Sequence, residues 1–273
     1  RLVLPALPTD RAVLLTARSD GRPIFLIPWL GRTLLGTTDT PFDGPAGSER
    51  VEDRDIDYLL TETRRALVDQ PWSESDIVGS FAGVRAMVSS TAKSPGAVPR
   101  EWKLGEPTPG LMLSLGGKLT SARADAAQAV DVVARRLGHA LASSTTDSHP
   151  FPWTPEGVFA DWLDDAVRRG ERLGLDPEAA RSAALRHGRN VDRLHALLVA
   201  EPALAARISP ACPLVMAEVV HAARDEMAGT VEDILRRRVP LAILTGDDSA
   251  ALAAATRLAE RELQGGRTIV EAT

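Results

Sequence analysis

The pattern of apolar and polar positions predicts strands in the first part of the chain and helices in the second. Short β-branched or aromatic runs, separated by turns that contain glycine, predict strands at 11–17, 22–29 and 32–39. Leu30 and Gly31 predict that the last two strands form a hairpin. Apolar residues on one helical face predict a helix over about 53–68, and strand character returns at 76–87.

The middle of the chain combines loop-forming residues with one strongly apolar run. Residues 88–110 are loop-rich and flank an extended piece at 98–104. The run LMLSLGG at 111–117 predicts a buried strand. Residues 120–138 predict a helix that Thr120 caps and Gly138 ends. The proline-rich stretch at about 139–154 then predicts a linker or a surface crossing.

The second part predicts an all-α domain, because strand signals are nearly absent from it. Glycine or proline separates most of its predicted helices, which lie at 156–172, 177–187, 190–200, 213–227, 230–238 and 248–263. Thr230 and Asp233 predict a variant of the capping box, and we expect His187 and His195 on helix surfaces. The predicted organisation is therefore an α+β region over 1–140, followed by a helical domain over 150–273.

Composition and charge exclude several classes of protein. Apolar residues make up 44% and charged residues 25% of the chain, as in ordinary globular proteins. A net charge of -5 gives no reason to expect a nucleic-acid partner, and no apolar run of about 18 residues predicts a membrane-spanning helix. Cys212 is the only cysteine, which predicts a small packing residue in a reducing, cytoplasmic setting. The start at Arg1, directly in an apolar run, predicts that the chain is a piece of a longer protein.

Two glycines and a lysine stand between the apolar run and the helix that follows it. Gly116, Gly117 and Lys118 fit a strand, a tight turn and a helix N-terminus, where proteins often hold anions. The stretch is not a Walker P-loop, because Met112 stands at its first glycine position and Leu119 at its Ser/Thr position. The chain has only three lysines among its 32 basic residues, so a lysine here favours a compact ammonium. On spacing alone, an ordinary strand-to-helix turn is the favoured explanation.

Charged residues near strand ends are further candidates. Arg85 follows an apolar strand, and Arg100 lies in the extended piece before the run at 111–117. Arginine forks match phosphate and carboxylate oxygens, although a solvated surface position explains either residue taken alone. Asp39 is a candidate general base or a turn-capping residue. No metal site is predicted.

A family resemblance rests on five stretches of the first part and one of the second. RPIFLIPWLGRTLLGTTDT, DIDYLL, DIVGSFAGVRAMV, SPGAVPREWKL and LMLSLGGKLTSAR occur in the order and at the spacing seen in FAD-dependent glycerol-3-phosphate dehydrogenases. AARDEMAGTVEDILRRRVPLAIL resembles the signature of that family's helical C-terminal domain. The resemblance implies a flavoprotein of the D-amino-acid-oxidase type. This chain would hold its antiparallel substrate-binding sheet, the last strand and helix of its FAD domain, and the helical domain.

The implied reaction moves a hydride from C2 of sn-glycerol 3-phosphate to FAD, giving dihydroxyacetone phosphate, and a quinone accepts the electrons. The family's GxGxxG motif for FAD does not occur in this chain, so we expect the chain alone to be inactive. The alternatives are an oxygen-reducing glycerol-3-phosphate oxidase and a non-redox phosphate-binding or scaffold module. A peripheral contact with the cytoplasmic face of the membrane and a homodimer are left open.

The resemblance also implies roles for single residues. Arg85 resembles the family's active-site arginine, beside substrate and flavin, and Arg100 and Lys118 resemble ligands of the substrate phosphate. The turn beside the flavin ring matches these residues: Gly116, Gly117, Lys118, Leu119 and Thr120. The family's tyrosine in this motif is absent, because Ala122 follows Ser121 here. The family's histidine before the opening strand would fall at or before Arg1, which leaves the catalytic base unassigned.

Overall fold

The computed structural model describes residues 1–45, 47–67, 72–85, 101–140, 142–246 and 248–270. They form two compact units, of which unit 1 comprises Arg1–Thr38, Val51–Ala82 and Pro152–Thr273. Unit 2 comprises Asp39–Arg50 and Gly83–Phe151. The division into domains over 1–140 and 150–273 stays a prediction. In the described part of the chain, none of the helices has the length and apolarity needed to cross a membrane.

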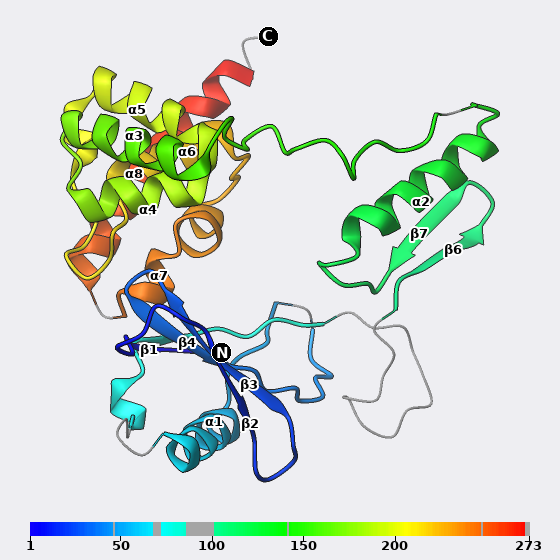
Figure 1. The fold of residues 1–273 in the computed structure, drawn as a ribbon, viewed down its shortest axis with the longest axis horizontal. Coiled ribbons are helices and arrows are strands. Elements are labelled where there is room, and N and C mark those ends of the chain that lie inside the picture. The colour runs from blue at the N-terminus through cyan, green and yellow to red at the C-terminus, as the bar shows by residue number, and fades with distance from the viewer. Residues whose placement is uncertain (46, 68–71, 86–100, 141, 247, 271–273) are drawn as a thin grey trace. The chain divides into compact units, whose positions relative to one another are not determined.

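Unit 1 begins with a five-stranded antiparallel sheet (Figure 1). Its strands are β1 (Leu2–Pro5), β2 (Val13–Thr16), β3 (Pro23–Trp29), β4 (Arg32–Gly36) and β5 (Gly79–Ser80), in the order β2-β3-β4-β1-β5. The three strands predicted between residues 11 and 39 are confirmed. The strand predicted at 76–87 is reduced to β5, because only Gly79 and Ser80 pair with β1. β1 itself lies in the opening apolar run.

The β3–β4 hairpin and helix α1 (Asp53–Ala66) form as the sequence predicts. Leu30 and Gly31 both have positive φ, at 49° and 75°, which is the backbone of a type I′ turn and matches the twist of paired strands. The sheet and α1 enclose one core between them, which includes Leu2, Leu4, Ile24, Leu26, Leu35, Leu59, Leu60 and Trp72. Burial of this apolar surface is the main stabilising contribution to the sheet layer.

The helical part of unit 1 contains α3 (Phe159–Arg172), α4 (Pro177–His187), α5 (Val191–Ala200), α6 (Met216–Asp225), α7 (Leu241–Leu244) and α8 (Ser249–Val270). Shorter turns of helix are η3 (Gly188–Asn190), η4 (Pro202–Ala205) and η5 (Asp233–Arg238), and η1 (Glu74–Asp76) precedes β5. The sequence predicted an ordinary helix at 230–238, but η5 has π-helical hydrogen bonding. The capping box is confirmed, since Thr230 and Asp233 exchange backbone-to-side-chain hydrogen bonds of 3.0 Å.

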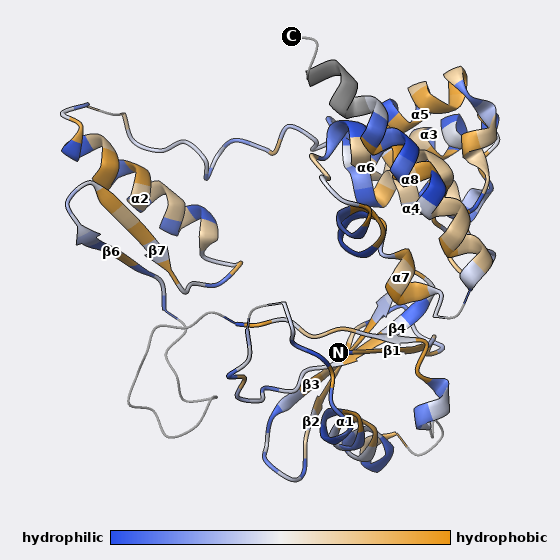
Figure 2. Cartoon of the chain, turned by 180° about the vertical axis from the view of Figure 1, so that it is seen from behind, coloured by the Kyte–Doolittle hydropathy of each residue, from blue (hydrophilic) through white to orange (hydrophobic). Residues whose placement is uncertain are grey.

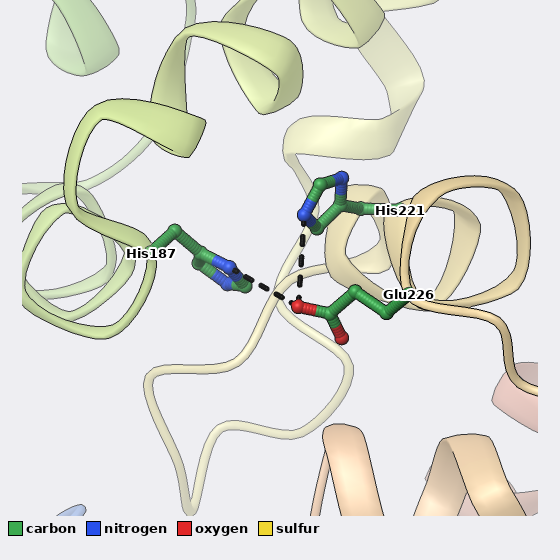
Figure 3. A group of neighbouring side chains, drawn as sticks. All are labelled: His187, His221 and Glu226. Atoms are coloured by element: carbon green, nitrogen blue, oxygen red, sulfur yellow. Dashed lines mark ion pairs between the residues drawn. The ribbon is translucent and has the colours of Figure 1, made fainter. Parts of the chain in front are cut away.

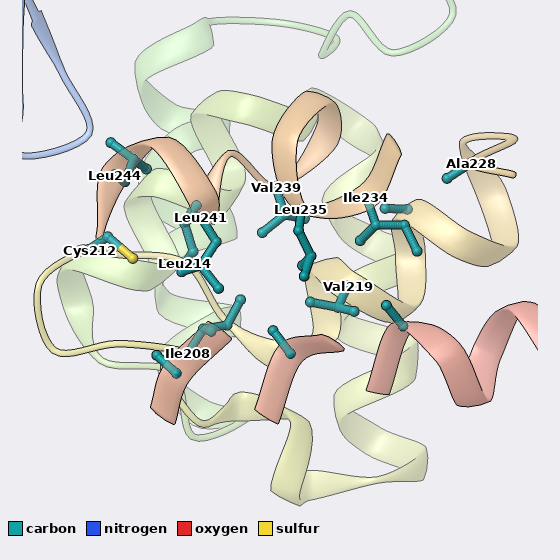
Figure 4. Close-up of a cluster of buried hydrophobic side chains, with 14 residues drawn as sticks. Ile208, Cys212, Leu214, Val219, Ala228, Ile234, Leu235, Val239, Leu241 and Leu244 are labelled. Atoms are coloured by element: carbon teal, nitrogen blue, oxygen red, sulfur yellow. The ribbon is translucent and has the colours of Figure 1, made fainter. Parts of the chain in front are cut away.

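The helices enclose a core built from residues between Ile208 and Ala259, shown in Figure 4. Cys212 is 2% exposed within it, as expected for a packing residue. The prediction that His187 and His195 lie on helix surfaces is wrong. The side chain of His187 is only 8% exposed and His195 is 7% exposed, because neighbouring helices cover the faces that carry them.

Within unit 1 the helices pack directly on the sheet. Val3 of β1, Leu34 of β4 and Ile243 of α7 form one buried apolar cluster, and Trp29 packs against both this cluster and the helical core. Gly79 of β5 lies so close that a Cβ there would be 2.2 Å from the carbonyl oxygen of Ile243. The sheet layer and the helical layer are therefore in tight backbone contact.

Unit 2 contains the β6 (Lys103–Thr108) and β7 (Leu111–Leu115) hairpin and helix α2 (Ala122–Arg136). The predicted strand at 111–117 and the predicted helix at 120–138 are confirmed, and Gly138 follows the helix with a φ of 73°. The prediction that the strand is buried is wrong: Leu111, Leu113 and Leu115 are 51%, 37% and 45% exposed. Side chains alternate along a strand, so these three share one face, and the described residues leave that face exposed. Figure 2 shows β7 in the colour of hydrophobic residues.

Candidate functional site

The candidate site is the turn that joins β7 to α2. Gly116 and Gly117 have φ values of 69° and 96°, which L-residues with a side chain rarely adopt. A Cβ on Gly116 would also lie 2.9 Å from the carbonyl oxygen of Glu101. The turn therefore requires glycine for its own backbone.

Three side chains after the glycines are exposed: those of Lys118, Leu119 and Thr120. Leu119 is 95% exposed, which is unusual for a leucine in a tight turn. No carboxylate in the described part of the chain forms an ion pair with the Lys118 ammonium. The turn thus presents a free cation and an apolar side chain next to each other in the sequence.

The predicted cap at Thr120 is wrong, because α2 begins two residues later, at Ala122, with Ser121 as its N-cap. The Ser121 hydroxyl lies 3.2 Å from the carbonyl oxygen of Lys118 and 2.7 Å from Oδ2 of Asp125. These contacts fasten the turn to the first turn of the helix. The positive end of the helix dipole therefore lies directly after the exposed lysine.

Arg85 lies beside an aspartate that the sequence presented as a separate candidate. Its NH1 is 3.2 Å from Oδ2 of Asp39, and the side chains of Arg85 and Asp39 are 43% and 21% exposed. No hydrogen bond or ion pair joins Arg85 to Lys118 in the residues that the structure describes. Arg100 lies outside the described residues. The Arg85–Asp39 pair was missed by sequence reasoning, since 46 residues separate its members.

A shallow groove on α2 is a second feature of unit 2. It has a volume of about 310 Å³ and is lined by Ala129, Val130, Val133, Ala134, Leu137 and His139. Val130, Val133 and Leu137 are 57%, 38% and 67% exposed, and their spacing places them on one face of the helix. The groove offers mainly apolar surface, and His139 is the one ionisable residue in its lining.

The site fits part of a flavin and phosphate site. An open glycine turn, a free ammonium and a helix N-terminus can hold anionic groups, whether phosphate or the polar edge of a reduced flavin ring. The chain contains no GxGxxG motif to hold a dinucleotide pyrophosphate, so a complete FAD site needs residues besides these. No group with the geometry of a catalytic base is assigned.

Comparison with known proteins gives a match to a domain family for the helical part of the chain. Residues 159–266 match the family model of the C-terminal domain of alpha-glycerophosphate oxidase. The chain is 32% identical over 242 residues to a glycerol-3-phosphate dehydrogenase of Synechocystis sp., covering 86% of this chain and 43% of that protein. It is 30% identical to the aerobic glycerol-3-phosphate dehydrogenase of Staphylococcus haemolyticus, covering 85% of this chain and 42% of that protein.

A solved structure extends the similarity to nearly every residue. The glycerol-3-phosphate dehydrogenase of Bacillus halodurans complexed with FAD has a TM-score of 0.74 and 27% sequence identity to this chain. The match covers 99% of this chain and 55% of that one, and it confirms the predicted fold class. The chain is thus similar to glycerol-3-phosphate dehydrogenases over most of its length, and its helical part to the C-terminal domain of alpha-glycerophosphate oxidase. It spans about two fifths of the length of the curated relatives that it matches.

Proposed function

We propose that this chain is the substrate-side and C-terminal part of an FAD-dependent glycerol-3-phosphate dehydrogenase. The reaction would convert sn-glycerol 3-phosphate to dihydroxyacetone phosphate, and FAD, when bound, supplies the hydride acceptor. The observation that carries the proposal is the turn between β7 and α2, with the exposed Lys118, which no described residue pairs with, before a helix N-terminus. The names of the relatives supply the substrate and the cofactor.

Lys118 would bind the substrate phosphate together with arginine side chains. A phosphate dianion needs two or three converging cations, and the resemblance supplies Arg85 and Arg100 beside Lys118. Arg85 is held by Asp39 in the structure, so one of its N–H groups already has a partner and the others are available to an oxyanion. Asp39 would thereby orient Arg85.

The turn itself would contact the flavin. Backbone N–H groups at Gly116 and Gly117 can approach a ring closely, and the exposed Leu119 side chain can cover its apolar surface. The helix N-terminus after the turn favours the negative charge of the reduced ring. Each of these contacts needs a cofactor that is held elsewhere by its phosphates.

We therefore infer that the FAD phosphates are bound by a part of the enzyme outside these 273 residues. Two features support the inference: the chain has no GxGxxG motif, and unit 2 exposes apolar faces on β7 and α2. A dinucleotide-binding sheet placed against these two apolar faces would bury them. The chain alone is then inactive and binds FAD weakly.

The electron acceptor and the location are also proposals. We assign a quinone as acceptor and a cytoplasmic location with peripheral contact to the membrane. An oxygen-reducing glycerol-3-phosphate oxidase is the alternative within the family, and the family model that matches residues 159–266 carries an oxidase in its description. Turnover with a quinone analogue against turnover with dissolved oxygen separates the two. A homodimer would be detected by light scattering.

Substitution of Lys118 tests the proposal. The chain joined behind the FAD-binding part of a relative should oxidise glycerol 3-phosphate, and Lys118→Ala should raise KM by roughly 10- to 100-fold, the loss of a charge-assisted hydrogen bond. The unfolding free energy should change by less than about 0.5 kcal/mol, since the ammonium is exposed and has no partner among the residues that the structure describes. Lys103→Ala, an exposed lysine of β6, is the matched control and should leave KM unchanged.

Binding measurements on the chain alone separate the proposal from a non-redox phosphate-binding module. A module would bind inorganic phosphate through Lys118 in the chain alone, with no effect of FAD. Tight, stoichiometric binding of FAD to the chain alone would contradict the inference that a further part is needed. An unchanged KM for Lys118→Ala would contradict the role of the turn.

A further inference from the structure

The helical part of unit 1 brings two histidines and a glutamate together, far from the turn in sequence (Figure 3). His187 ends α4, His221 lies in α6 and Glu226 follows α6. Oε1 of Glu226 is 3.9 Å from Nδ1 of His187 and 3.7 Å from Nε2 of His221. The two rings meet edge to face, with centroids 5.2 Å apart. The side chains of His187 and His221 are only 8% and 2% exposed.

The other ring nitrogen of each histidine is held by its own carboxylate. Nε2 of His187 is 3.0 Å from Oε1 of Glu218, and Nδ1 of His221 is 2.8 Å from Oδ2 of Asp225. A carboxylate accepts hydrogen bonds, so each of these nitrogens carries the proton and donates. Glu218 is itself fixed, because its second oxygen accepts from the N–H of Val215 at 2.9 Å. The orientation and the tautomer of both rings are thereby set.

The remaining ring nitrogens then carry lone pairs in the neutral histidines. Both face Oε1 of Glu226, at distances too long for hydrogen bonds. Three acceptor atoms therefore converge in a largely buried place: Nδ1 of His187, Nε2 of His221 and Oε1 of Glu226. Converging lone pairs repel one another, and a positive charge between them removes the repulsion.

We propose that His187, His221 and Glu226 bind a divalent transition-metal ion, with zinc as the preferred ion. The three ligand atoms lie within 4.8 Å of one another. Two ligands of a tetrahedral zinc ion, each at about 2.0–2.1 Å, are about 3.3 Å apart, so the nitrogen-to-Glu226 distances of 3.9 and 3.7 Å must shorten by roughly half an ångström when the ion binds. The two nitrogens lie no more than 4.8 Å apart, so they must approach each other by at most about 1.5 Å, which rotations of the side chains can supply.

The surrounding groups are those that a zinc site uses. Zinc-bound histidines almost always donate their second N–H to a carboxylate, a backbone carbonyl or water, and Glu218 and Asp225 are such carboxylates here. Imidazole nitrogen favours zinc and its neighbours in the transition series, whereas calcium and magnesium take oxygen ligands. The free fourth position would hold water, since Glu226 is 32% exposed.

Nearby arginines leave the binding oxygen of Glu226 available. The Arg238 guanidinium lies 4.0 Å from Oε2 of Glu226, the other oxygen of that carboxylate. Arg186 and Arg193 pair with Glu218 and Asp225, the two carboxylates that orient the rings. A bound ion would tie the end of α4 to α6 and stabilise the packing of the helical part.

Zinc binding to the whole chain tests the proposal. Chain freed of any affinity tag and of metal by a chelator should take up one Zn²⁺ per chain in a calorimetric titration, and its thermal midpoint should rise. Glu226→Gln and His187→Gln should each weaken zinc binding by at least the 10- to 100-fold that loss of an orienting partner typically costs. The double variant His139→Gln with His149→Gln removes two exposed histidines of unit 2 and should bind zinc as the native chain does.

A second measurement needs no variant and guards against variants that fail to fold. Co²⁺ added to the native chain should give the visible absorption of a low-coordinate nitrogen and oxygen site, and Zn²⁺ should displace it. Absence of uptake would overturn the proposal. Uptake that survives both Glu226→Gln and His187→Gln but is lost in the control variant overturns it as well.

Discussion

Replacement of Gly79 by alanine tests how the helices are held on the sheet. Gly79 lies in β5, next to Val3 of β1, and packs against α7. The added Cβ would lie 2.2 Å from the carbonyl oxygen of Ile243 and 3.1 Å from its carbonyl carbon. Both are backbone atoms, so no side-chain rotation relieves the contact. The backbone of α7 must move away from the sheet by roughly an ångström to restore an ordinary contact distance.

The expected loss of unfolding free energy follows from the apolar contacts that this movement separates. Val3, Leu34 and Ile243 are each at most 9% exposed and form the cluster at this junction. Overpacking of a well-packed site typically costs about 1–3 kcal/mol. Loss of glycine's freedom in the unfolded chain offsets about 0.4–1 kcal/mol of this. We therefore expect Gly79→Ala to lower the unfolding free energy by about 1–2 kcal/mol.

Urea denaturation of the chain, followed by circular dichroism, measures this change. Gly83→Ala is the matched control, because nothing lies within 4 Å of a Cβ there and its φ is not positive. The unfolded-state term is the same for both substitutions, so the difference between the two variants isolates the packing cost, about 1–3 kcal/mol. Gly83→Ala should be neutral or slightly stabilising.

Equal stability of the two variants would refute the reasoning. Such a result would mean that α7 does not rest on β5 in solution, or that the contact yields without cost. A loss of stability in both variants would show that the backbone, not the added methyl group, is the cause.

The remaining predictions concern two titratable side chains of the helical part, Asp176 and His195. Asp176 pairs with Arg207 and also caps α4, where it accepts from the N–H of Ala179 at 3.1 Å. The Arg207 hydrogen bond, with the capping bonds, lowers the pKa of Asp176 to about 2. Asp176→Ala should lower the unfolding free energy by about 0.5–2 kcal/mol at pH 7, and Asp176→Ser, which keeps a cap, by less. The difference between these variants and the native chain should shrink as the pH falls from about 4 to about 2. Burial, with Arg169 nearby, lowers the pKa of His195, so its neutral ring is favoured by folding. Stability should fall as the pH drops below about 6.5, and His195→Gln should weaken that fall, measured by urea denaturation at stepped pH.

Much of the secondary structure could be predicted because its signals are local. α4 was predicted with its observed bounds, 177–187. Asp176 accepts hydrogen bonds from the first turn, Pro177 is suited to the first helical position, and Gly188 takes a φ of 53° after the last. Turn-forming residues likewise predicted the position of the β3–β4 hairpin. Each of these features depends on residues only a few positions apart.

Features that depend on distant partners could not be predicted in the same way. The strand at 76–87 shortened to β5, because strand length is set by pairing with β1, which is 70 or more residues away. Asp39 and Arg85 meet across 46 residues, and His187 and Glu218 across 31. Neither spacing matches a local motif. The glycine turn was located correctly, yet its glycines are explained by their positive φ and by the carbonyl of Glu101, which the sequence could not show.

The wrong prediction of a buried β7 has a physical meaning for the protein. Apolar residues on alternate positions indicate a strand made for burial, and a two-stranded sheet is marginally stable by itself. None of the described residues of unit 2 buries that face, and α2 carries a second exposed apolar stripe that includes Val130, Val133 and Leu137. Two such faces in one small unit favour further layers of structure rather than a free-standing module. We expect the FAD-binding part to supply them, which would bring the cofactor to the same unit that carries Lys118.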